Sequence, residues 1–291
     1  MPKTRRYRKR RNQRKYKRTR KMRGGNSSGS PVLIDYPHFT KRIEDGGPEE
    51  VNGVPLNIYE TYGSLSIPPK MKECIDKLRN ANPEFNHYLY SDTECLKFIK
   101  ENFDQEVADA FTALKPGAYK SDLWRYCILY KLGGVYMDIK LYTSDGVSLK
   151  EIIQQTPEVF VLDIDDSSNR CATKLSIYNA FMISPPKNDI FKKCIDSIVA
   201  CCKERCYKES YLSVTGPCLL GSVLAKTLSL NLEDYKKNHA VKLVPTATGH
   251  ASIQISGTTI VNEYDGYRDE LGATQKTVHY AEAWKNKDIY N

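Results

Sequence analysis

The side chains best suited to chemistry lie in one stretch, residues 116–140. Asp122 and Arg125 are three residues apart, so they share a face if this stretch is helical. Tyr136 and Asp138 follow on the next segment. Two carboxylates, a guanidinium and a phenol that meet at one edge of a sheet could bind and orient a ligand. A surface ion pair on a helix, with a strand-terminal aspartate capping a turn, explains the same residues without a site.

The same stretch predicts a helix, a glycine stop and a strand that would hold these side chains. The helix is indicated by apolar residues at i, i+3, i+4 and i+7, namely Leu123, Tyr126, Cys127 and Tyr130. Gly133 and Gly134 would end it, since glycine adopts a left-handed conformation most easily. Residues 135–140 alternate as a strand, which would put Tyr136, Asp138 and Lys140 on one face.

This stretch resembles the core of a known enzyme family. Residues 121–126, Ser-Asp-Leu-Trp-Arg-Tyr, and the string from Ile128 to Asp138 are similar to the family 32 type of glycosyltransferases, whose sugar-binding region contains a DxD motif. That family includes yeast initiating mannosyltransferases and relatives in giant DNA viruses. The resemblance implies a GT-A fold, a Rossmann-like α/β domain that transfers a hexose from a nucleotide diphosphate sugar to an acceptor hydroxyl with retention of configuration. Asp122 and Arg125 would then orient the sugar hydroxyls.

The motif departs from the family at its second acidic residue. The family's Asp-x-Asp holds a divalent cation on the donor diphosphate, whereas this chain has Asp138-Ile139-Lys140. We expect Mn²⁺ or Mg²⁺ at Asp138, because such sites often use one or two carboxylates plus phosphate oxygens. The Lys140 ammonium could itself neutralise the diphosphate. The resemblance makes His279 a further metal or phosphate ligand, although a lone histidine is more often structural. A literal Asp-x-Asp at Asp163 is more typical of a solvated loop start.

Further candidates for donor binding lie outside the central stretch. Tyr59 and Tyr62 stand near the end of the first predicted strand, where the resemblance places the donor base, and aromatic rings stack on bases. Core tyrosines beside an edge strand explain them equally well. The resemblance also implies sugar recognition by Asn179, an acceptor side at Thr215-Gly216-Pro217 and a tryptophan folded back over the diphosphate. The predicted donor site therefore comprises Tyr59, Tyr62, Tyr136, Lys140, Asn179 and Trp284.

The first 30 residues differ in composition from the rest of the chain. Residues 3–23 carry 14 of the 44 Lys and Arg residues and no acid, and a Gly/Ser-rich linker follows. With almost no apolar side chains, residues 1–30 are expected to be a disordered arm. Its charge suits nucleic acid, an anionic surface or an import signal, and equally a solubilising tail. Residues 31–291, where 35 acidic residues outnumber the basic ones, fit one α/β domain.

Composition also bounds location and leaves a second function class open. The sequence contains no run of 18 apolar residues, so it predicts no membrane-spanning helix. The nine cysteines include no CxxC pair, which favours reduced thiols over a disulfide framework. We therefore expect a cytoplasmic protein. The basic arm, the Asp-Ile-Lys variant and the His-Tyr-x-x-x-Trp ending resemble the giant-virus branch of the family, which implies the host cytoplasm or virion of a large DNA virus. The alternative function is a catalytically idle sugar-nucleotide fold that acts as a structural or nucleic-acid-associated protein through its arm. Lys140 in place of an aspartate keeps this alternative open.

Overall fold

Helix α4 (Gly117–Leu132) is the element predicted between Pro116 and Gly133. It belongs to a computed structural model that describes residues 31–44, 46–246, 251–274 and 278–291, with the side chains of residues 165 and 166 excepted. The sequence predicts one buried face for this helix, whereas the helix is buried on nearly every side, and even Trp124 and Arg125 are enclosed. Gly133 ends the helix at φ +67°, where an added Cβ would meet the backbone nitrogen of Pro186 at 2.6 Å.

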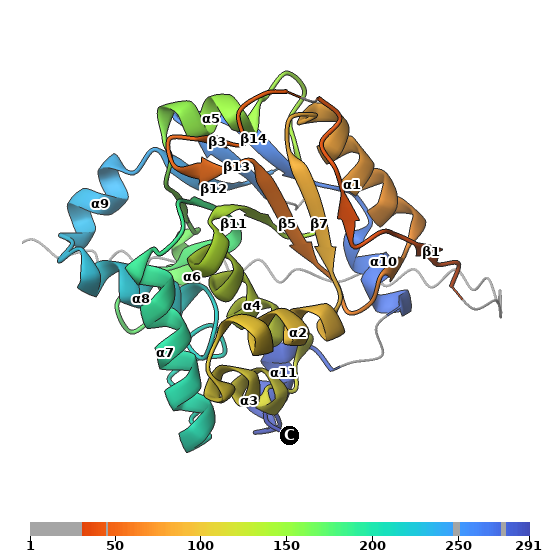
Figure 1. Cartoon of the computed structure of the whole chain (residues 1–291). Coiled ribbons are helices and arrows are strands. Elements are labelled where there is room, and N and C mark those ends of the chain that lie inside the picture. The colour runs from red at the N-terminus through yellow and green to blue at the C-terminus, as the bar shows by residue number, and fades with distance from the viewer. Residues whose placement is uncertain (1–30, 45, 247–250, 275–277) are drawn as a thin grey trace, which may run out of the picture. The chain divides into compact units, whose positions relative to one another are not determined.

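The main sheet of the described residues has ten strands in the order β2-β7-β5-β8-β11-β10-β12-β13-β14-β9 (Figure 1). Strands β7, β5 and β8 pair in parallel, and β11 is antiparallel to β8. Parallel strands connected by helices agree with the α/β class expected for residues 31–291. The strands are β2 (Phe39–Thr40), β5 (Asn57–Thr61), β7 (Asn86–Tyr90), β8 (Gly134–Met137), β9 (Leu141–Thr143), β10 (Val159–Leu162), β11 (Ile177–Ser184), β12 (Val241–Pro245), β13 (Ala251–Ile255) and β14 (Thr258–Glu263). Short pairs form between β1 (Ile34–Asp35) and β6 (Ser66–Ile67), and between β3 (Glu50–Val51) and β4 (Val54–Pro55).

Helices cover both faces of the sheet, so two hydrophobic cores form (Figure 1). On one face lie α1 (Pro69–Ala81) and α5 (Leu149–Gln155), and on the other lie α2 (Asp92–Asn102), α3 (Gln105–Ala113), α4, α7 (Asp189–Glu204) and α8 (Pro217–Thr227). Successive side chains of β8 point to opposite faces of the sheet, so Tyr136 packs in the core on the α4 side and Val135 and Met137 pack in the core on the α1 side. The remaining helices are α6 (Asp165–Ser168), α9 (Leu232–Asn238), α10 (Tyr267–Thr274) and α11 (Tyr280–Lys285).

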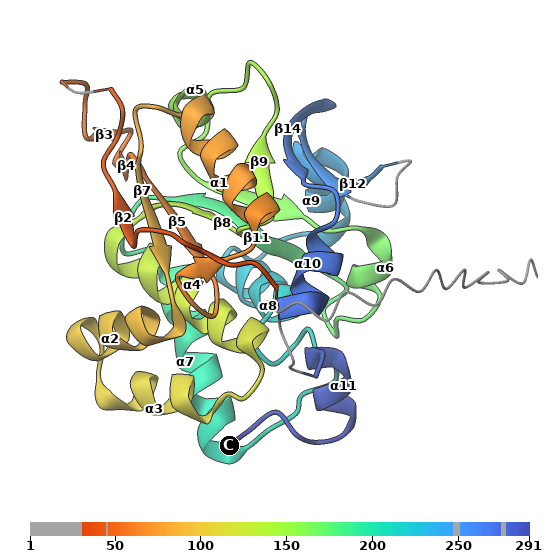
Figure 2. The same ribbon diagram turned by 90° about the vertical axis from the view of Figure 1, so that its right-hand side faces the viewer.

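A turn after β8 shapes the region of the predicted motif. The strand predicted over residues 135–140 ends at Met137, and residues 138–140 turn directly into β9. β9 lies at the far end of the strand order, where it pairs with β14 beside α1 (Figure 2). The sheet therefore curls around this turn. Asp138 and Lys140 lie in the turn rather than on one face of a strand, which corrects the predicted alternation.

Two disulfides contradict the prediction that all nine thiols are reduced. Cys171 bonds to Cys218, and Cys201 bonds to Cys206. The other five cysteines are free. The sequence spacing showed no paired pattern because Cys171 and Cys218 are 47 residues apart and meet only through the tertiary fold.

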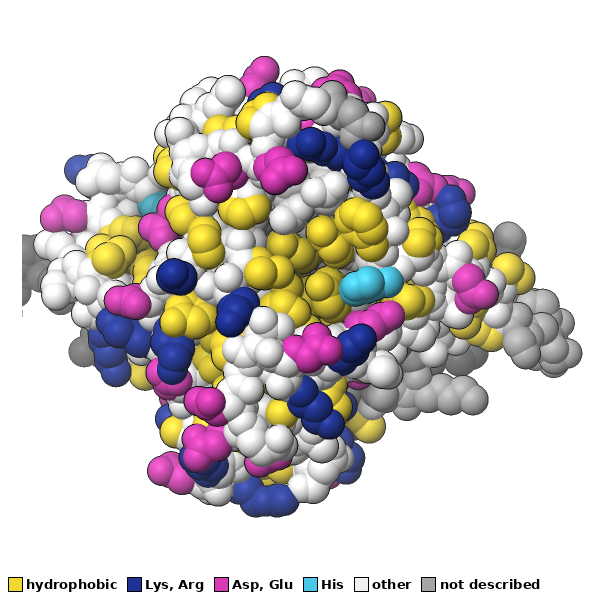
Figure 3. Space-filling view, viewed as in Figure 1, with side chains coloured by type: hydrophobic (Ala, Val, Ile, Leu, Met, Phe, Trp, Pro, Cys, Tyr) yellow, Lys and Arg dark blue, Asp and Glu magenta, His cyan; other side chains and the backbone are white. Residues whose placement is uncertain are grey.

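The surface of the described part mixes apolar and charged side chains. Figure 3 shows hydrophobic side chains gathered across the middle of the face seen in Figure 1, with charged side chains above and below them. Among the described helices, none combines the length and the apolar character that crossing a bilayer requires. Residues 31–291 form one compact unit. The arm predicted at residues 1–30 lies outside the described residues, so its disorder stays a prediction.

Candidate active site

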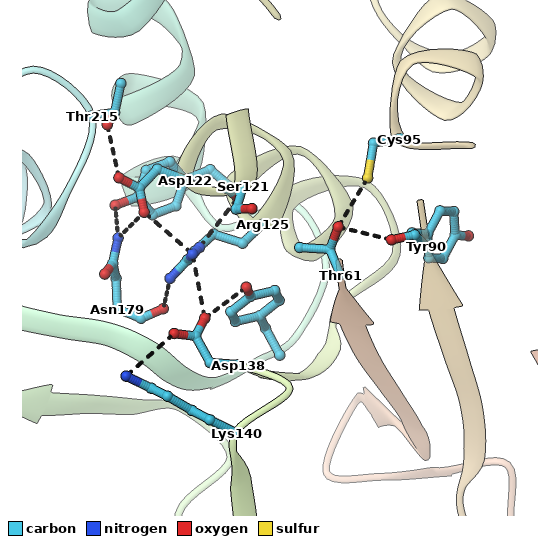
Figure 4. Close-up of polar contacts among 12 residues, drawn as sticks. Thr61, Tyr90, Cys95, Ser121, Asp122, Arg125, Asp138, Lys140, Asn179 and Thr215 are labelled. Atoms are coloured by element: carbon cyan, nitrogen blue, oxygen red, sulfur yellow. Dashed lines mark hydrogen bonds and ion pairs between the residues drawn. The ribbon is translucent and has the colours of Figure 1, made fainter. Parts of the chain in front are cut away.

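The carboxylate of Asp122 is held by side chains from three segments of the chain, seen in the upper left of Figure 4. It accepts hydrogen bonds from the amide of Asn179 on β11 at 2.9 Å and from the hydroxyl of Thr215, before α8, at 2.7 Å. Arg125 lies one turn along α4, with its Nη2 3.3 Å from Asp122 Oδ1. Burial raises the pKa of Asp122, and Arg125, Thr215 and Asn179 offset part of this rise by favouring the charged form. Both carboxylate oxygens of Asp122 therefore accept hydrogen bonds from protein side chains.

Arg125 joins the two carboxylates of the site. Its Nη2 lies 3.3 Å from Asp122 and 3.4 Å from Asp138, while Nη1 donates to the backbone oxygen of Asn179 at 2.7 Å and Nε to that of Ser121. The guanidinium also stacks over the ring of Tyr136, 4.5 Å from its centroid. With every guanidinium nitrogen engaged and 5% exposure, Arg125 is placed to position the carboxylates rather than to hold sugar hydroxyls itself.

Asp138 is the more open of the two carboxylates. Its side chain is 26% exposed, compared with 12% for Asp122. The Tyr136 hydroxyl donates to Asp138 Oδ1 at 2.9 Å. Burial raises the pKa of Tyr136 well above its usual value, so the phenol stays neutral and keeps its proton for this bond. Asp138 is thus fixed from behind and open in front, as a substrate-binding carboxylate must be.

Lys140 lies beside Asp138, between two carboxylates. Its Nζ is 4.0 Å from Asp138 Oδ2 and 3.5 Å from Glu263 Oε2 at the end of β14. The rings of Tyr178 and Tyr267 lie 5.9 and 5.5 Å from the ammonium. Burial opposes its charge, but Tyr178, Asp138 and Glu263 outweigh burial and raise the pKa of Lys140 above its usual value. Lys140 is therefore a permanent cation of this site.

The described residues do not fit a metal ion held by protein ligands. No group of three or more His, Cys, Asp or Glu side chains in the described ranges is arranged to hold one. Asp138 supplies a single carboxylate, and an ammonium occupies the motif position from which the family motif would supply the second. Asp163, from the other Asp-x-Asp string, accepts from Ser176 Oγ at 2.7 Å and from the Ile164 backbone at 2.8 Å, which is a loop-capping role.

Four predicted site residues lie outside this network. Tyr59 is 1% exposed and stacks on Tyr88, because its position on β5 turns it into the α4-side core, so base stacking by Tyr59 would need a rearrangement. The Tyr62 hydroxyl bonds to Thr274 at 2.8 Å. The Trp284 indole donates to the backbone oxygen of Tyr207. His279 is exposed, and its Nδ1 accepts from the Ala281 backbone at the start of α11. Donor or metal binding by Tyr62, Trp284 and His279 stays a prediction.

Sequence reasoning missed a group of tyrosines next to Asp122. Tyr119, one turn before Asp122 on α4, donates to the backbone oxygen of Tyr211 at 2.8 Å. The ring of Tyr280 on α11 lies 6.0 Å from that of Tyr119 and 5.7 Å from that of Tyr211. Arg170 donates to the Tyr211 hydroxyl at 2.7 Å. Tyr119 is buried, whereas Tyr211 and Tyr280 are partly exposed, and Tyr211 shares one loop with Thr215, so these two rings border the site.

Comparison with known proteins agrees with the resemblance. Residues 68–159, which include Asp122, Asp138 and Lys140, match the family described as "Glycosyltransferase sugar-binding region containing DXD motif". The chain is similar to mannosyl phosphorylinositol ceramide synthase SUR1 of Saccharomyces cerevisiae, with 26% identity over 70% of this chain and 50% of that protein. It is also similar to the initiation-specific alpha-1,6-mannosyltransferase of Candida albicans, with 31% identity over 36% of this chain and 27% of that protein.

An uncharacterized glycosyltransferase, L373, of Acanthamoeba polyphaga mimivirus is 29% identical over 30% of this chain and 36% of that protein. Among solved structures, the PaToxG glycosyltransferase gives a TM-score of 0.44 at 14% identity and covers 81% of this chain and 85% of that one. The chain spans about half or less of the length of these curated relatives. Residues 68–159 thus match the sugar-binding region of the DXD glycosyltransferase family, in agreement with the resemblance, and they lie in a mixed α/β domain.

Proposed function

We propose that this chain is a glycosyltransferase that moves a hexose from a nucleotide diphosphate sugar to an acceptor hydroxyl. The observation that carries the proposal is the linked set Asp122, Arg125, Asp138 and Lys140, which lies inside the matched sugar-binding region. Two of the relatives are named as mannosyltransferases or as a mannosyl-lipid synthase, so mannose is the first sugar to test.

In the proposed reaction the bond between the anomeric carbon and the β-phosphate oxygen breaks, and its electron pair leaves with that oxygen. The acceptor hydroxyl oxygen bonds to the anomeric carbon. Its proton ends on the released diphosphate, since a phosphate with a second pKa of about 6 is a stronger base than a carboxylate. Retention of configuration stays a prediction from the resemblance.

The side chains contribute by position and by charge. Asp138, open in front, accepts hydrogen bonds from sugar hydroxyls, and Arg125 keeps it aligned with Asp122. Lys140 presents its positive charge where negative charge develops on the leaving diphosphate, and such fixed charges stabilise a transition state. DXD glycosyltransferases generally use divalent cations, and the predicted Mn²⁺ or Mg²⁺ stays a prediction for this chain. No step proposed here runs through a metal, because the described side chains do not supply its ligand set.

The tyrosines beside Asp122 suit the acceptor. Tyr211 and Tyr280 offer aromatic faces against which the apolar side of a sugar ring can pack. Arg170 donates to the Tyr211 hydroxyl at 2.7 Å and so helps to hold this ring in place. A glycan or protein acceptor remains the prediction from the resemblance.

The test is turnover with a panel of nucleotide sugars, GDP-mannose among them, measured as nucleotide release and as product formed. Asp138→Asn should lose transfer while it keeps the unfolding transition of the unchanged chain, because the amide cannot accept in the same way. Asp145→Asn is the matched control, since Asp145 is 93% exposed and pairs loosely with Lys77 at 3.5 Å. Near-normal turnover by Asp138→Asn would show that the site is wrongly assigned.

One observation favours a second candidate, the catalytically idle fold. Lys140 stands where the family motif has a carboxylate, as a chain that had lost its chemistry could also show. An idle fold would bind a nucleotide sugar and release no nucleotide from it, with any acceptor. Salt-sensitive DNA binding that is lost on removal of residues 1–30 would then indicate a nucleic-acid-associated role.

A further inference from the structure

We infer that this chain has replaced the divalent cation of its family by a cation of its own, the Lys140 ammonium, which binds the donor diphosphate directly. The inference rests on the proposed function and adds to it the means of donor binding. It predicts a transferase whose nucleotide site is complete without Mn²⁺ or Mg²⁺.

The position of the ammonium is the first support. Lys140 occupies the third place of the Asp-x-Asp motif, and its Nζ lies at the open carboxylate, 4.0 Å from Asp138 Oδ2. Figure 4 shows the lysine side chain below Asp138, on the side of the carboxylate opposite to Arg125. The lysine side chain is 19% exposed, so its charge is sheltered from solvent but still reachable by a ligand. A sheltered charge is screened less than a surface charge.

The surroundings of Lys140 are the second support. Glu263 holds the ammonium from the β14 side at 3.5 Å, and the rings of Tyr178 and Tyr267 flank it. Lys140 also shares a side-chain hydrogen bond with Tyr178, whereas its contacts to the two carboxylates, at 3.5 and 4.0 Å, are long for charge-assisted hydrogen bonds. An ammonium carries three donors, so those that Tyr178 does not engage can turn toward phosphate oxygens.

The repulsion between neighbouring cations is the third support. Arg125 and Lys140 lie among three carboxylates, those of Asp122, Asp138 and Glu263. A divalent cation at Asp138 would lie close to the ammonium, and the two would repel each other. In the described ranges no group of three or more acidic, histidine or cysteine side chains is arranged to hold a metal ion. The ammonium therefore occupies the place beside Asp138 that a metal ion would need.

The same geometry predicts how metal dependence could be restored. Lys140→Asp would create an Asp-x-Asp motif beside Glu263. The ammonium that lies between Asp138 and Glu263 would be replaced by a third carboxylate. Hard oxygen ligands of this kind suit Mn²⁺ and Mg²⁺. The variant should therefore gain a metal site and lose metal-free binding of the diphosphate.

The experiment measures binding of GDP and UDP to the full chain by calorimetry, in EDTA and in Mn²⁺, and binding of Mn²⁺ alone by electron paramagnetic resonance. For the unchanged chain we expect nucleotide affinity to differ less than about twofold between EDTA and Mn²⁺. For Lys140→Asp we expect affinity in EDTA to fall about tenfold or more, since a hydrogen-bonded charge is lost, and to recover with Mn²⁺. Lys140→Arg should keep metal-free binding. Lys203→Asp, which makes the same charge change at a surface pair with Glu106, should behave as the unchanged chain.

Each outcome separates the inference from the proposed function. If Mn²⁺ raised nucleotide affinity of the unchanged chain tenfold, or EDTA abolished its binding, the inference would be overturned while the proposed function stood. If no nucleotide bound with or without Mn²⁺, both would be overturned. If Lys140→Asp failed to unfold cooperatively, Lys140→Met would replace it, with the same expected loss in EDTA and no recovery in Mn²⁺. Metal-free binding by Lys140→Met equal to that of the unchanged chain would refute a role for the ammonium.

Discussion

Replacing Arg125 by methionine should destabilise the protein more than any exchange at a surface ion pair. Methionine roughly fills the space of the arginine stem but removes the charge that faces both Asp122 and Asp138. Removing one partner of a buried pair costs about 3–5 kcal/mol, because a carboxylate is left uncompensated. At about 2–4 °C per kcal/mol for a domain of this size, Tm should fall by roughly 6–20 °C. The 26% exposure of Asp138 places the expected loss in the lower part of this range.

The assay is urea and thermal unfolding followed by circular dichroism. Lys115→Met is the control, because Lys115 pairs with Asp288 at 2.6 Å while both side chains are about half exposed, and such pairs contribute about 0–1 kcal/mol. Acid supplies a second readout. Burial already raises the pKa of Asp122, and loss of Arg125 raises it further, so the folded variant takes up a proton at a pH at which the unfolded chain does not. The difference in unfolding free energy between Arg125→Met and the unchanged chain should therefore shrink as pH falls from 7 toward 5. A loss below about 1 kcal/mol, or a deficit that grows on acidification, would refute the reasoning.

Three further predictions concern the acceptor surface, a disulfide and a buried histidine. Tyr280→Ala should raise KM for the acceptor about three- to tenfold and leave donor hydrolysis without acceptor unchanged; a parallel loss of both would place Tyr280 in the donor site. Cys171→Ser should lower the free energy of unfolding by about 2–4 kcal/mol, and dithiothreitol, which also reduces the Cys201–Cys206 bond, should lower that of the unchanged chain by at least as much; insensitivity to dithiothreitol would contradict the bond to Cys218. Burial lowers the pKa of His239, whose Nε2 lies 2.6 Å from the Phe160 oxygen, so the unfolded chain binds a proton first and stability should fall as pH drops below about 6.5. His239→Gln should flatten this dependence, and an unchanged pH slope would exclude His239 as its source.

Local pattern was enough to predict the elements that carry the site. The apolar spacing and the glycine stop placed α4 within one residue of its observed ends, and the i, i+3 relation of Asp122 to Arg125 is confirmed at 3.3 Å. The predicted nearness of Asp138 to the helix pair is also found, since Arg125 Nη2 lies 3.4 Å from Asp138 Oδ1. These features depend on neighbours in sequence or on a motif, so the sequence contains them directly.

The remaining partners depend on contacts between distant segments. Thr215 reaches Asp122 from the loop before α8, and Glu263 reaches Lys140 because β14 pairs with β9. The amide of Asn179 is bonded to Asp122 because β11 lies antiparallel to β8, and sugar recognition by Asn179 stays a prediction. No local periodicity encodes such pairings. The prediction of reduced cysteines was wrong for the same reason, since Cys171 meets Cys218 across the fold.

The turn between β8 and β9 has a consequence for the order of folding. β8 pairs with β5, which precedes it in the chain, but the first residue of β9, Leu141, pairs with Glu263, which is made long afterwards. Contacts of such high sequence separation form slowly, because a long loop must close before they are gained. During synthesis α4 and β8 can assemble early, whereas the contact between Lys140 and Glu263 can form only after β14 has been made. The ammonium should therefore acquire its final place only when the last strands of the sheet arrive, so a nascent chain would hold its carboxylates before it could bind a diphosphate.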